Sequence, residues 1–477
     1  MRSLLLWLAV CSAALAHVGS PDVFYDGKAG PYRLLVAVRP PAVIPGVAEV
    51  EVRSMSPDVR EVRVVPLRLT GPGAQFAPTP DVAQRSKEDL QFYTGSLWLM
   101  GFGAWQVRVT ADGAQGKGEL SVPVPAMATR SSTMQKGMGA LLVALMLVLV
   151  AGVVSIVGAS VREAQLEPGV APPEKIRKRA NVVMGVTFAL VCLAVYLGWK
   201  WWDAEATAYA GNVYKPLQMS ATVNGKGRLQ LELQDTGWFR FSKLDDLVPD
   251  HGHLMHLYII SAPTMDRVWH LHPEETEPGA FAMDLPAMPA GRYRFYADVV
   301  HSNGLGETGT TEAEIPAVAG APPSADDAAG SGTTVSQADF NRTVSPLAGG
   351  YRMVWERSAA PLRAKRAELF QFRVEDANGK PARDMELYMG MPGHAAFVCD
   401  DFTVFAHVHP SGSAPMAAMM MTRDSAGMHN MDSMRMDGPP AVVSFPYGFP
   451  RPGNYRIFVQ VKRAGKVETG IFDARVE

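Results

Sequence analysis

The 477-residue sequence predicts a mainly β protein with two transmembrane α-helices and three immunoglobulin-like or cupredoxin-like β-sandwich domains. Short alternating or β-branched stretches between Gly and Pro turns recur through most of the chain, as in sandwich strands. Two uncharged apolar stretches interrupt them, each about long enough to cross a bilayer core of about 30 Å. A secretion-type N-terminus completes the pattern.

Residues 1–16 fit a signal peptide, with Arg2 before an apolar stretch and the cleavage-site pattern Ala14-Leu15-Ala16. Cleavage there would leave His17 as the mature N-terminus. An uncleaved signal anchor and a lipid-modified Cys11 remain alternatives.

The next segment, residues 17–136, is expected to be the first β-sandwich, followed by helices at 137–159 and 181–202. The connecting loop 160–180 is rich in Lys and Arg, which predicts that it is cytoplasmic. With a secreted start and two crossings, all three β-domains would then lie on the outer side of a membrane.

The remaining chain divides at residues 317–337, which are rich in Ala, Gly, Ser and Pro and are expected to be a flexible linker. A second sandwich is predicted at 203–316 and a third at 338–477. Asn-Gly turn signals at 224–225 and 378–379 open the two domains. Both end on similar strands, so we interpret them as a divergent tandem repeat.

Histidines concentrate in this repeat. Each domain has a Gly-His pair and a His-x-His-Pro string, and two residues at i, i+2 on a strand share a face. Histidine is the commonest metal ligand. We therefore align His253 with His394 and expect each domain to bind about one ion. The expected ligands are His253, His270 and His272 in the second domain and His394, His407 and His409 in the third.

Three other histidines of the second domain are not assigned as ligands. His251 and His256 cannot both share a strand face with His253 and Met255 unless the strand begins between them, and His301 has no histidine counterpart because its equivalent is at or near Arg463.

Methionines near the third domain's histidines favour copper, because thioethers bind cuprous ion and imidazoles bind cupric ion. Zinc is the alternative, since three histidines suit it equally. Met389 and Met391 are predicted sulfur ligands. Met428, His429, Met431 and Met434 are predicted to form a copper-capturing loop, with an exposed sticky loop as the alternative. Residues 419–421 are expected in a buried strand.

Other classes have less support. A net charge of −2 indicates no nucleic-acid partner. No nucleophile elbow, phosphate loop or HExxH motif is present, so no enzyme is predicted. His394, Cys399 and His407 have the order of a blue-copper site, but the gaps between them are too wide.

Two resemblances add to this interpretation. Residues 17–46 and 92–109 resemble the YtkA-like or FixH-like extracytoplasmic modules, which implies membrane association and, for some members, oxidase assembly. Residues 250–301 and 389–461 resemble a bacterial extracytoplasmic unit of presumed copper handling. As the mature N-terminus, His17 can chelate cupric ion through its α-amine and ring nitrogen, which resembles the arrangement of CopC-type proteins, although the second histidine of that arrangement is missing from residues 18–136.

These resemblances imply a location at the bacterial cytoplasmic membrane, with the β-domains in the periplasm. The sequence thus predicts a copper-binding protein for capture, delivery or resistance, with a copper-dependent oxidase or an efflux system as partner. The alternative is an assembly protein whose β-sandwiches bind other proteins without metal.

Overall fold

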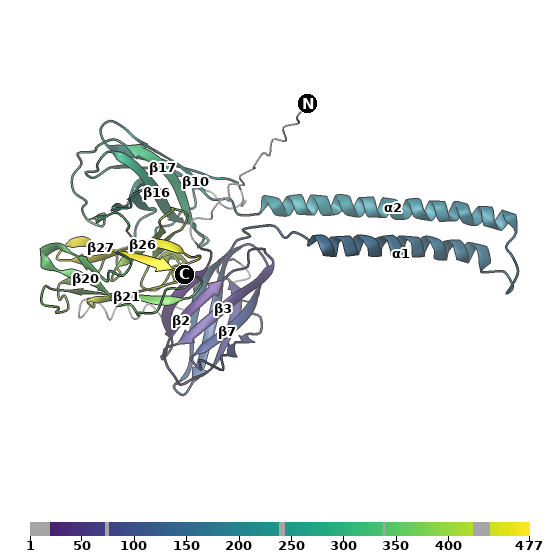
Figure 1. Ribbon diagram of the computed structural model, residues 1–477, viewed down its shortest axis with the longest axis horizontal. Coiled ribbons are helices and arrows are strands. Elements are labelled where there is room, and N and C mark those ends of the chain that lie inside the picture. The colour runs from purple at the N-terminus through teal and green to yellow at the C-terminus, as the bar shows by residue number, and fades with distance from the viewer. Residues whose placement is uncertain (1–19, 72–75, 238–243, 337–338, 423–438) are drawn as a thin grey trace, which may run out of the picture. The chain divides into compact units, whose positions relative to one another are not determined.

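The chain forms two units in the computed structural model, which describes residues 20–71, 76–237, 244–336, 339–422 and 439–477. One unit combines Met1–Thr129 with Tyr214–Glu477, and the other is Arg130–Val213 (Figure 1). Strands dominate the first unit and helices form the second. The mainly β prediction is confirmed, while the immunoglobulin-like or cupredoxin-like identity of the domains stays a prediction.

The helical unit is an antiparallel pair, α1 (Lys136–Glu163) and α2 (Glu174–Gly211) (Figure 1). Both helices are long and apolar enough to cross a membrane, with mean hydropathies of 3.0 and 2.2 in their most apolar windows. The helices pack closely at Gly158, since the space that a side chain there would need is filled by the Met184 sulfur.

Both helices extend beyond the predicted spans, so the expected loop 160–180 shortens to residues 164–173. The basic stretch after Pro173 is helical, and Lys178 pairs with Glu174 one turn away at 2.8 Å. Such i, i+4 pairs stabilise a helix by a few tenths of a kcal/mol.

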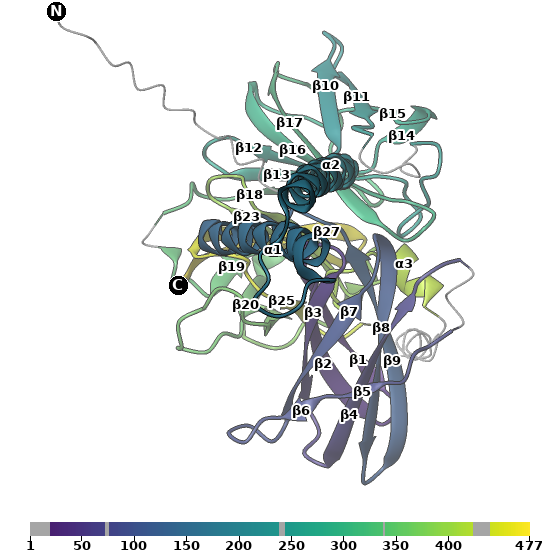
Figure 2. The ribbon, with the colours of Figure 1, turned by 90° about the vertical axis from the view of Figure 1, so that its right-hand side faces the viewer.

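The N-terminal domain is a β-sandwich of two sheets (Figure 2). One sheet has the order β1-β2-β3-β7-β6 and the other β5-β4-β8-β9. Their strands are β1 (Val23–Ala29), β2 (Tyr32–Arg39), β3 (Gly46–Ser54), β4 (Val59–Arg68), β5 (Asp81–Val82), β6 (Gln84–Arg85), β7 (Phe92–Leu99), β8 (Gly103–Gly113) and β9 (Gly116–Ala126).

Strand β1 also joins this domain to the third. The Phe24 ring lies 5.7 Å from that of Tyr447, edge to face, and belongs to the third domain's hydrophobic core. The backbone of Phe24 accepts a hydrogen bond from the Ser413 N–H at 3.0 Å. The loop after His409 is therefore held by two domains.

The second domain differs from a two-sheet expectation, because its strands follow one hydrogen-bonded path, β14-β15-β11-β10-β17-β16-β12-β13-β18. The strands are β10 (Gln218–Val223), β11 (Arg228–Gln234), β12 (His256–Ser261), β13 (Arg267–Leu271), β14 (Glu274–Glu277), β15 (Ala280–Asp284), β16 (Gly291–Val300), β17 (Gly306–Ile315) and β18 (Ala328–Ser331).

Strand β18 lies inside the segment expected to be a flexible linker, and that expectation does not hold for its residues. It pairs antiparallel with β13, with His270 opposite Ala328. The unpaired edge of β13 offers backbone donors and acceptors that a segment of small residues can satisfy.

The third domain has two sheets, β19-β20-β21-β25 and β22-β26-β23-β24, with β27 paired to β26. The elements are β19 (Val344–Pro346), η3 (Ala348–Gly350), β20 (Arg352–Trp355), β21 (Glu368–Glu375), β22 (Met385–Glu386), β23 (His394–Cys399), β24 (Phe405–Val408), α3 (Met416–Met421), β25 (Val442–Tyr447), β26 (Gly453–Arg463) and β27 (Lys466–Val476).

Residues 419–421 lie in helix α3, so the predicted buried strand is wrong. The helix buries Met416, Ala417 and Ala418, whereas Met420 is 58% exposed. A single turn with one apolar face accounts for the methionines better than an alternating strand does.

The second and third domains share one structural core. Strands follow the order β17-β16-β12-β13 in one and β27-β26-β23-β24 in the other, all antiparallel. The matching outer faces pack together around a buried cluster, with Tyr258 and Tyr296 on one side and Phe405 and Phe458 on the other. The predicted tandem repeat thus forms a pseudo-twofold pair.

Candidate metal centre

Strand registers define which residues of the two repeats are equivalent. Tyr258 pairs with His270 between β12 and β13, and Ala396 pairs with His407 between β23 and β24. His256, two residues before Tyr258, is therefore the counterpart of His394, two residues before Ala396. The alignment of His253 with His394 was wrong by three residues.

The turn before each strand confirms this correspondence. His251 and Gly252 have φ of 51° and 90°, and Met389 and Gly390 have φ of 50° and 79°. Left-handed backbone is easy for glycine and uncommon for other residues, so the match is specific. The Gly-His pairs at 252–253 and 393–394 are therefore not equivalent. The feature that the two repeats share is the left-handed turn at 251–252 and 389–390.

Seven histidines from the two repeats meet between the domains. This histidine cluster consists of His251, His256, His270, His272, His394, His407 and His409. Two triads within it each bring three ring nitrogens within 4.8 Å of one another. The first triad is His256, His270 and His272, and the second is His251, His394 and His409.

In the first triad, the outer nitrogen of each ring is tied to an oxygen acceptor. His256 Nε2 lies 2.9 Å from the Asp250 carbonyl, His270 Nδ1 lies 2.8 Å from Gln460 Oε1, and His272 Nδ1 lies 3.1 Å from Asp327 Oδ1. Because these oxygens accept, each of those nitrogens carries the proton.

The inner nitrogens of this triad therefore present lone pairs. His256 Nδ1 and His270 Nε2 face each other at 3.2 Å with no proton between them. That gap is close to the roughly 3.3 Å between two ligands of a tetrahedral metal with bonds of about 2.0 Å. Outer-shell acceptors that orient ligating histidines are typical of metal sites.

The second triad spans both repeats. His251 Nδ1 donates to the Met389 carbonyl at 3.1 Å, so its lone pair is on Nε2. The His251 ring lies 5.1 Å from that of His394 and 4.7 Å from that of His409. This arrangement differs from the expected self-contained ligand set in each domain, because His251 belongs to the second domain and the other two to the third.

Two equivalent contacts cross the interface. His270 bonds to Gln460 of the third domain, and its counterpart His407 contacts Asp298 of the second domain at 3.3 Å. Asp298 pairs with His256 on one side, and Gln460 pairs with His394 on the other. Each repeat thus orients a histidine of its partner from the same position.

Several inward ring nitrogens are buried without a hydrogen-bond partner among the described residues. They include His251 Nε2, His272 Nε2, His407 Nε2 and both nitrogens of His394. Leaving one such group unpaired costs about 1–3 kcal/mol. A metal ion could use several converging lone pairs at once.

Burial holds most of the cluster neutral. The pKa values of His256, His270, His394 and His409 lie well below the ordinary value, first because of burial and then because of neighbouring histidines. Burial likewise lowers the pKa of His251 and His272. Neutral imidazole is the form that binds metal.

The predicted ligands divide into three groups. His270, His272, His394 and His409 lie in the triads, and His407 lies beside both, with its ring 5.3 Å from that of His256 and 5.4 Å from that of His394. His253 stacks on His272 and contacts Asp326 at 3.4 Å, but is outside both triads.

The predicted sulfur ligands are not placed in a triad. Met389 contacts His251 through its carbonyl, and Met391 is buried, with its backbone paired to Tyr388. Their role as ligands stays a prediction. His17, Met428, His429, Met431 and Met434 lie outside the described residues.

Sequence analysis did not select His251 and His256, which the structure places in the two triads. The sequence pattern left them unassigned because both can share a strand face with His253 and Met255 only if the strand begins between them, and β12 does begin at His256. The available signal was the His-Gly turn followed four residues later by a strand-initiating histidine.

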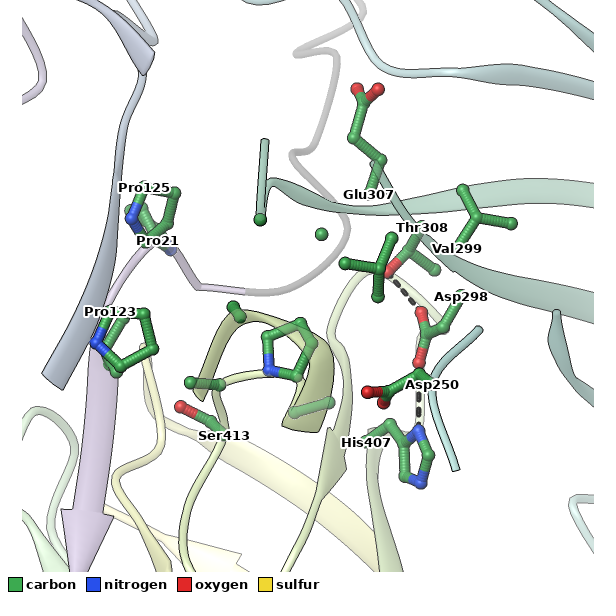
Figure 3. Close-up of a pocket in the computed structure, with 18 of the residues that line it drawn as sticks. Pro21, Pro123, Pro125, Asp250, Asp298, Val299, Glu307, Thr308, His407 and Ser413 are labelled. Atoms are coloured by element: carbon green, nitrogen blue, oxygen red, sulfur yellow. Dashed lines mark hydrogen bonds and ion pairs between the residues drawn. The ribbon is translucent and has the colours of Figure 1, made fainter. Parts of the chain in front are cut away.

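A cavity of about 160 Å³ opens onto the cluster. His256, His407 and His409 line it, together with the carboxylates of Asp250 and Asp298. Figure 3 shows Asp298 between Thr308 and His407, with Asp250 nearby. This acidic wall is suited to admitting a cation.

His301 has a separate, structural role. Its Nδ1 lies 2.6 Å from Asp246 and its Nε2 lies 2.9 Å from Glu307. The equivalent position is Arg463, which bonds to Asp384 and Glu468 in the same way. Burial opposes charging of His301, but the hydrogen bonds and charges of Glu307 and Asp246 outweigh it and raise the pKa.

Fold and site together define a class: a tandem β-domain protein with two candidate membrane helices and a buried polyhistidine cluster between the repeats. A family model described as "Domain of unknown function (DUF8832)" matches residues 210–316 and 343–477, about half of the chain. The chain belongs to this family. The matched segments contain all seven residues of the histidine cluster.

No curated protein is significantly similar in sequence. Among solved structures, the chain is similar to an engineered protein at 18% identity, covering 19% of this chain and 20% of that one, with a TM-score of 0.16. It is similar to a tetra-tandem repeat from the extending region of a large adhesion protein at 8% identity, covering 92% and 72%, with a TM-score of 0.17.

The chain is also similar to Salmonella alpha-2-macroglobulin at 7% identity, covering 95% of this chain, with a TM-score of 0.21. It spans about a quarter of that protein's length and a fifth of the engineered protein's. Likenesses this low do not define a fold or a function.

Proposed function

We propose that this chain is a membrane-anchored extracytoplasmic copper-binding protein that captures copper, delivers it or confers resistance to it. The observation that carries the proposal is the convergence of three ring nitrogens in the first triad, where His256 Nδ1 and His270 Nε2 lie 3.2 Å apart. Each ring is fixed by an acceptor on its far side. Such an arrangement is unfavourable without a cation and favourable with one.

Copper is preferred over zinc because of the surrounding chemistry of the sequence. Methionines are frequent next to the third domain's histidines, and thioether sulfur is a ligand for cuprous ion. An ion held by imidazoles and passed to thioethers can change its ligand set with its oxidation state. This property suits transfer to a copper-dependent oxidase or an efflux system.

Metal analysis of the full chain purified in detergent tests the proposal. The protein should bind copper more tightly than zinc in competition with a chelator of known affinity. The variant His270→Ala/His394→Ala should lose high-affinity copper binding, while His253→Ala should keep it. A wild-type protein that binds no copper, or a double variant with unchanged affinity, would contradict the proposal and favour a metal-free assembly role.

The membrane orientation is tested separately. A reporter placed at Pro172, between the two candidate spans, should behave as cytoplasmic, because the basic residues nearby favour that side. Protease added to intact spheroplasts should digest the β-domains. Protection of residues 214–477 from external protease would contradict an extracytoplasmic site.

A further inference from the structure

The two triads of the histidine cluster are close neighbours. The His251 and His256 rings, one from each triad, lie 6.0 Å apart, and the His270 and His394 rings, again one from each, lie 6.1 Å apart. A metal ion lies about 2 Å from each of its imidazole nitrogens. Ions bound in both triads would therefore be near neighbours, separated by distances comparable with those between the rings.

Each triad is incomplete as a metal shell. Three protein ligands around a four-coordinate ion leave one position open for water or another small ligand. In the first triad, the outer nitrogens of the three rings already bond to Asp250, Gln460 and Asp327. Each ring can therefore give an ion only its one inner nitrogen, which makes three ligands in all. A fourth ligand must come from the cluster itself or from the cavity.

The cavity reaches both triads. Its lining includes His256 from the first triad and His409 from the second, with His407 beside them. At about 160 Å³, it has room for a small anion or a few waters and is below the 300–1,000 Å³ usual for a larger ligand. Its carboxylates disfavour a free anion, so a small anion such as hydroxide or azide would enter only where bound cations offset their charge.

His407 is placed between the two triads. Its ring lies 5.5 Å from that of His270 and 4.6 Å from that of His409. Asp298 fixes its Nδ1, while its Nε2 is buried without a hydrogen-bond partner among the described residues. This nitrogen can complete the shell of either ion, and the same ring lines the cavity.

We propose that the two triads hold a coupled pair of copper ions that bind one small bridging anion from the cavity. This inference rests on the proposed copper function and adds to it the pairing of the two ions across the repeats and the class of exogenous ligand. The pair spans both repeats, because His251 and His394 belong to the same triad but to different domains.

The test is a cupric titration of the full chain in detergent, followed by electron paramagnetic resonance. Two ions per chain should bind, and the spectrum at full loading should show spin coupling, as a loss of isolated-copper intensity or a half-field signal. Azide should change that spectrum with a stoichiometry of one azide per two copper ions. Two additive, isolated copper spectra or a single bound ion would overturn the paired centre.

Matched variants separate the triads. His251→Ala and His272→Ala should each bind one copper with an isolated spectrum that azide leaves uncoupled, whereas His253→Ala should retain two coupled ions. Retention of two coupled ions by both triad variants would also overturn the proposal. Absence of copper from the wild-type protein would instead contradict the proposed function, so the two failures are distinguishable without relying on any variant.

Discussion

Adjacent aspartates have different relations to the histidine cluster. Asp327 accepts from His272 Nδ1, while Asp326 contacts His253, which is outside the triads. The Asp327 carboxylate also accepts from the His272 backbone N–H at 3.1 Å. It therefore fixes both the position and the tautomer of His272, as an outer-shell partner of the proposed metal site would.

We expect Asp327→Ala to weaken copper binding by about 10–100-fold, the usual cost of losing an outer-shell partner. Asp326→Ala is the matched control and should change affinity little. Chelator competition on both variants measures the difference. Equal losses in the two would indicate that His253 is as important as His272, or that the segment acts through folding alone.

His301 is the one described buried histidine whose charged form the fold favours. Its position between Asp246 and Glu307 matches that of Arg463 between Asp384 and Glu468. A histidine in place of a permanently charged arginine makes this clamp dependent on pH. A raised folded pKa means that its stabilisation is complete below the unfolded value of about 6.5 and disappears as pH rises through the folded pKa.

The Tm of the metal-free wild-type chain should therefore be higher than that of His301→Gln. The difference in Tm should be largest below pH 6.5 and should shrink toward pH 9. Arg463→Gln should lower Tm by an amount that does not change over the same range. Thermal unfolding followed by circular dichroism measures both. A difference in Tm between wild type and His301→Gln that does not change with pH would show that the neutral ring of His301 stabilises the fold as much as the imidazolium does.

At the scale of elements, Gly393 explains why β23 can lie against β26. A Cβ at this position would collide with the Gln460 carbonyl, a backbone atom that cannot move aside cheaply. His394 follows immediately and begins the strand. The glycine of the third domain's Gly-His pair thus permits strand approach, whereas Gly252 in the second domain adopts a positive φ.

We expect Gly393→Ala to destabilise the chain by about 1–3 kcal/mol, as overpacking usually does, and to reduce copper affinity by displacing His394. Gly225→Ala should be neutral, because Gly225 is exposed and a Cβ there meets nothing within 4 Å. Chemical denaturation and copper competition check both effects. A fully stable Gly393→Ala with normal affinity would contradict this account of the strand.

Sequence patterns predicted where the β-domains lie better than they predicted which residues of the two repeats are equivalent. Alternation and turn residues located the β-domains and the repeat, because these signals are local. Aligning the repeats needed the strand register, which depends on hydrogen bonds between β12, β13 and β16. Aligning the two Gly-His pairs therefore matched His394 with His253 instead of with His256. The segment 328–331 was similarly misjudged, since its composition carries no sign of the β13 edge that orders it.

At the scale of the whole molecule, the site is a property of two domains packed face to face. Histidines could be selected from sequence, but their convergence depends on contacts such as Tyr258 with Phe405, whose rings lie 5.3 Å apart. Gln460, which orients His270 across the interface, had no visible role in the sequence. A metal ion shared by both repeats would stabilise their packing as well as its own ligands.

Copper should consequently slow hydrogen exchange on both sides of that interface. A ligand at 100 times its Kd stabilises the state that binds it by about 2.7 kcal/mol, and His251 with His394 and His409 requires both domains in place. Amides of β13 and β24 should be protected by copper and released by a chelator, while β3 and β7 in the N-terminal sandwich serve as the unaffected control. Exchange measured by mass spectrometry distinguishes the possibilities. Protection confined to residues 251–300 would mean that the second domain holds the metal alone, and the inter-domain triad would then have to be abandoned.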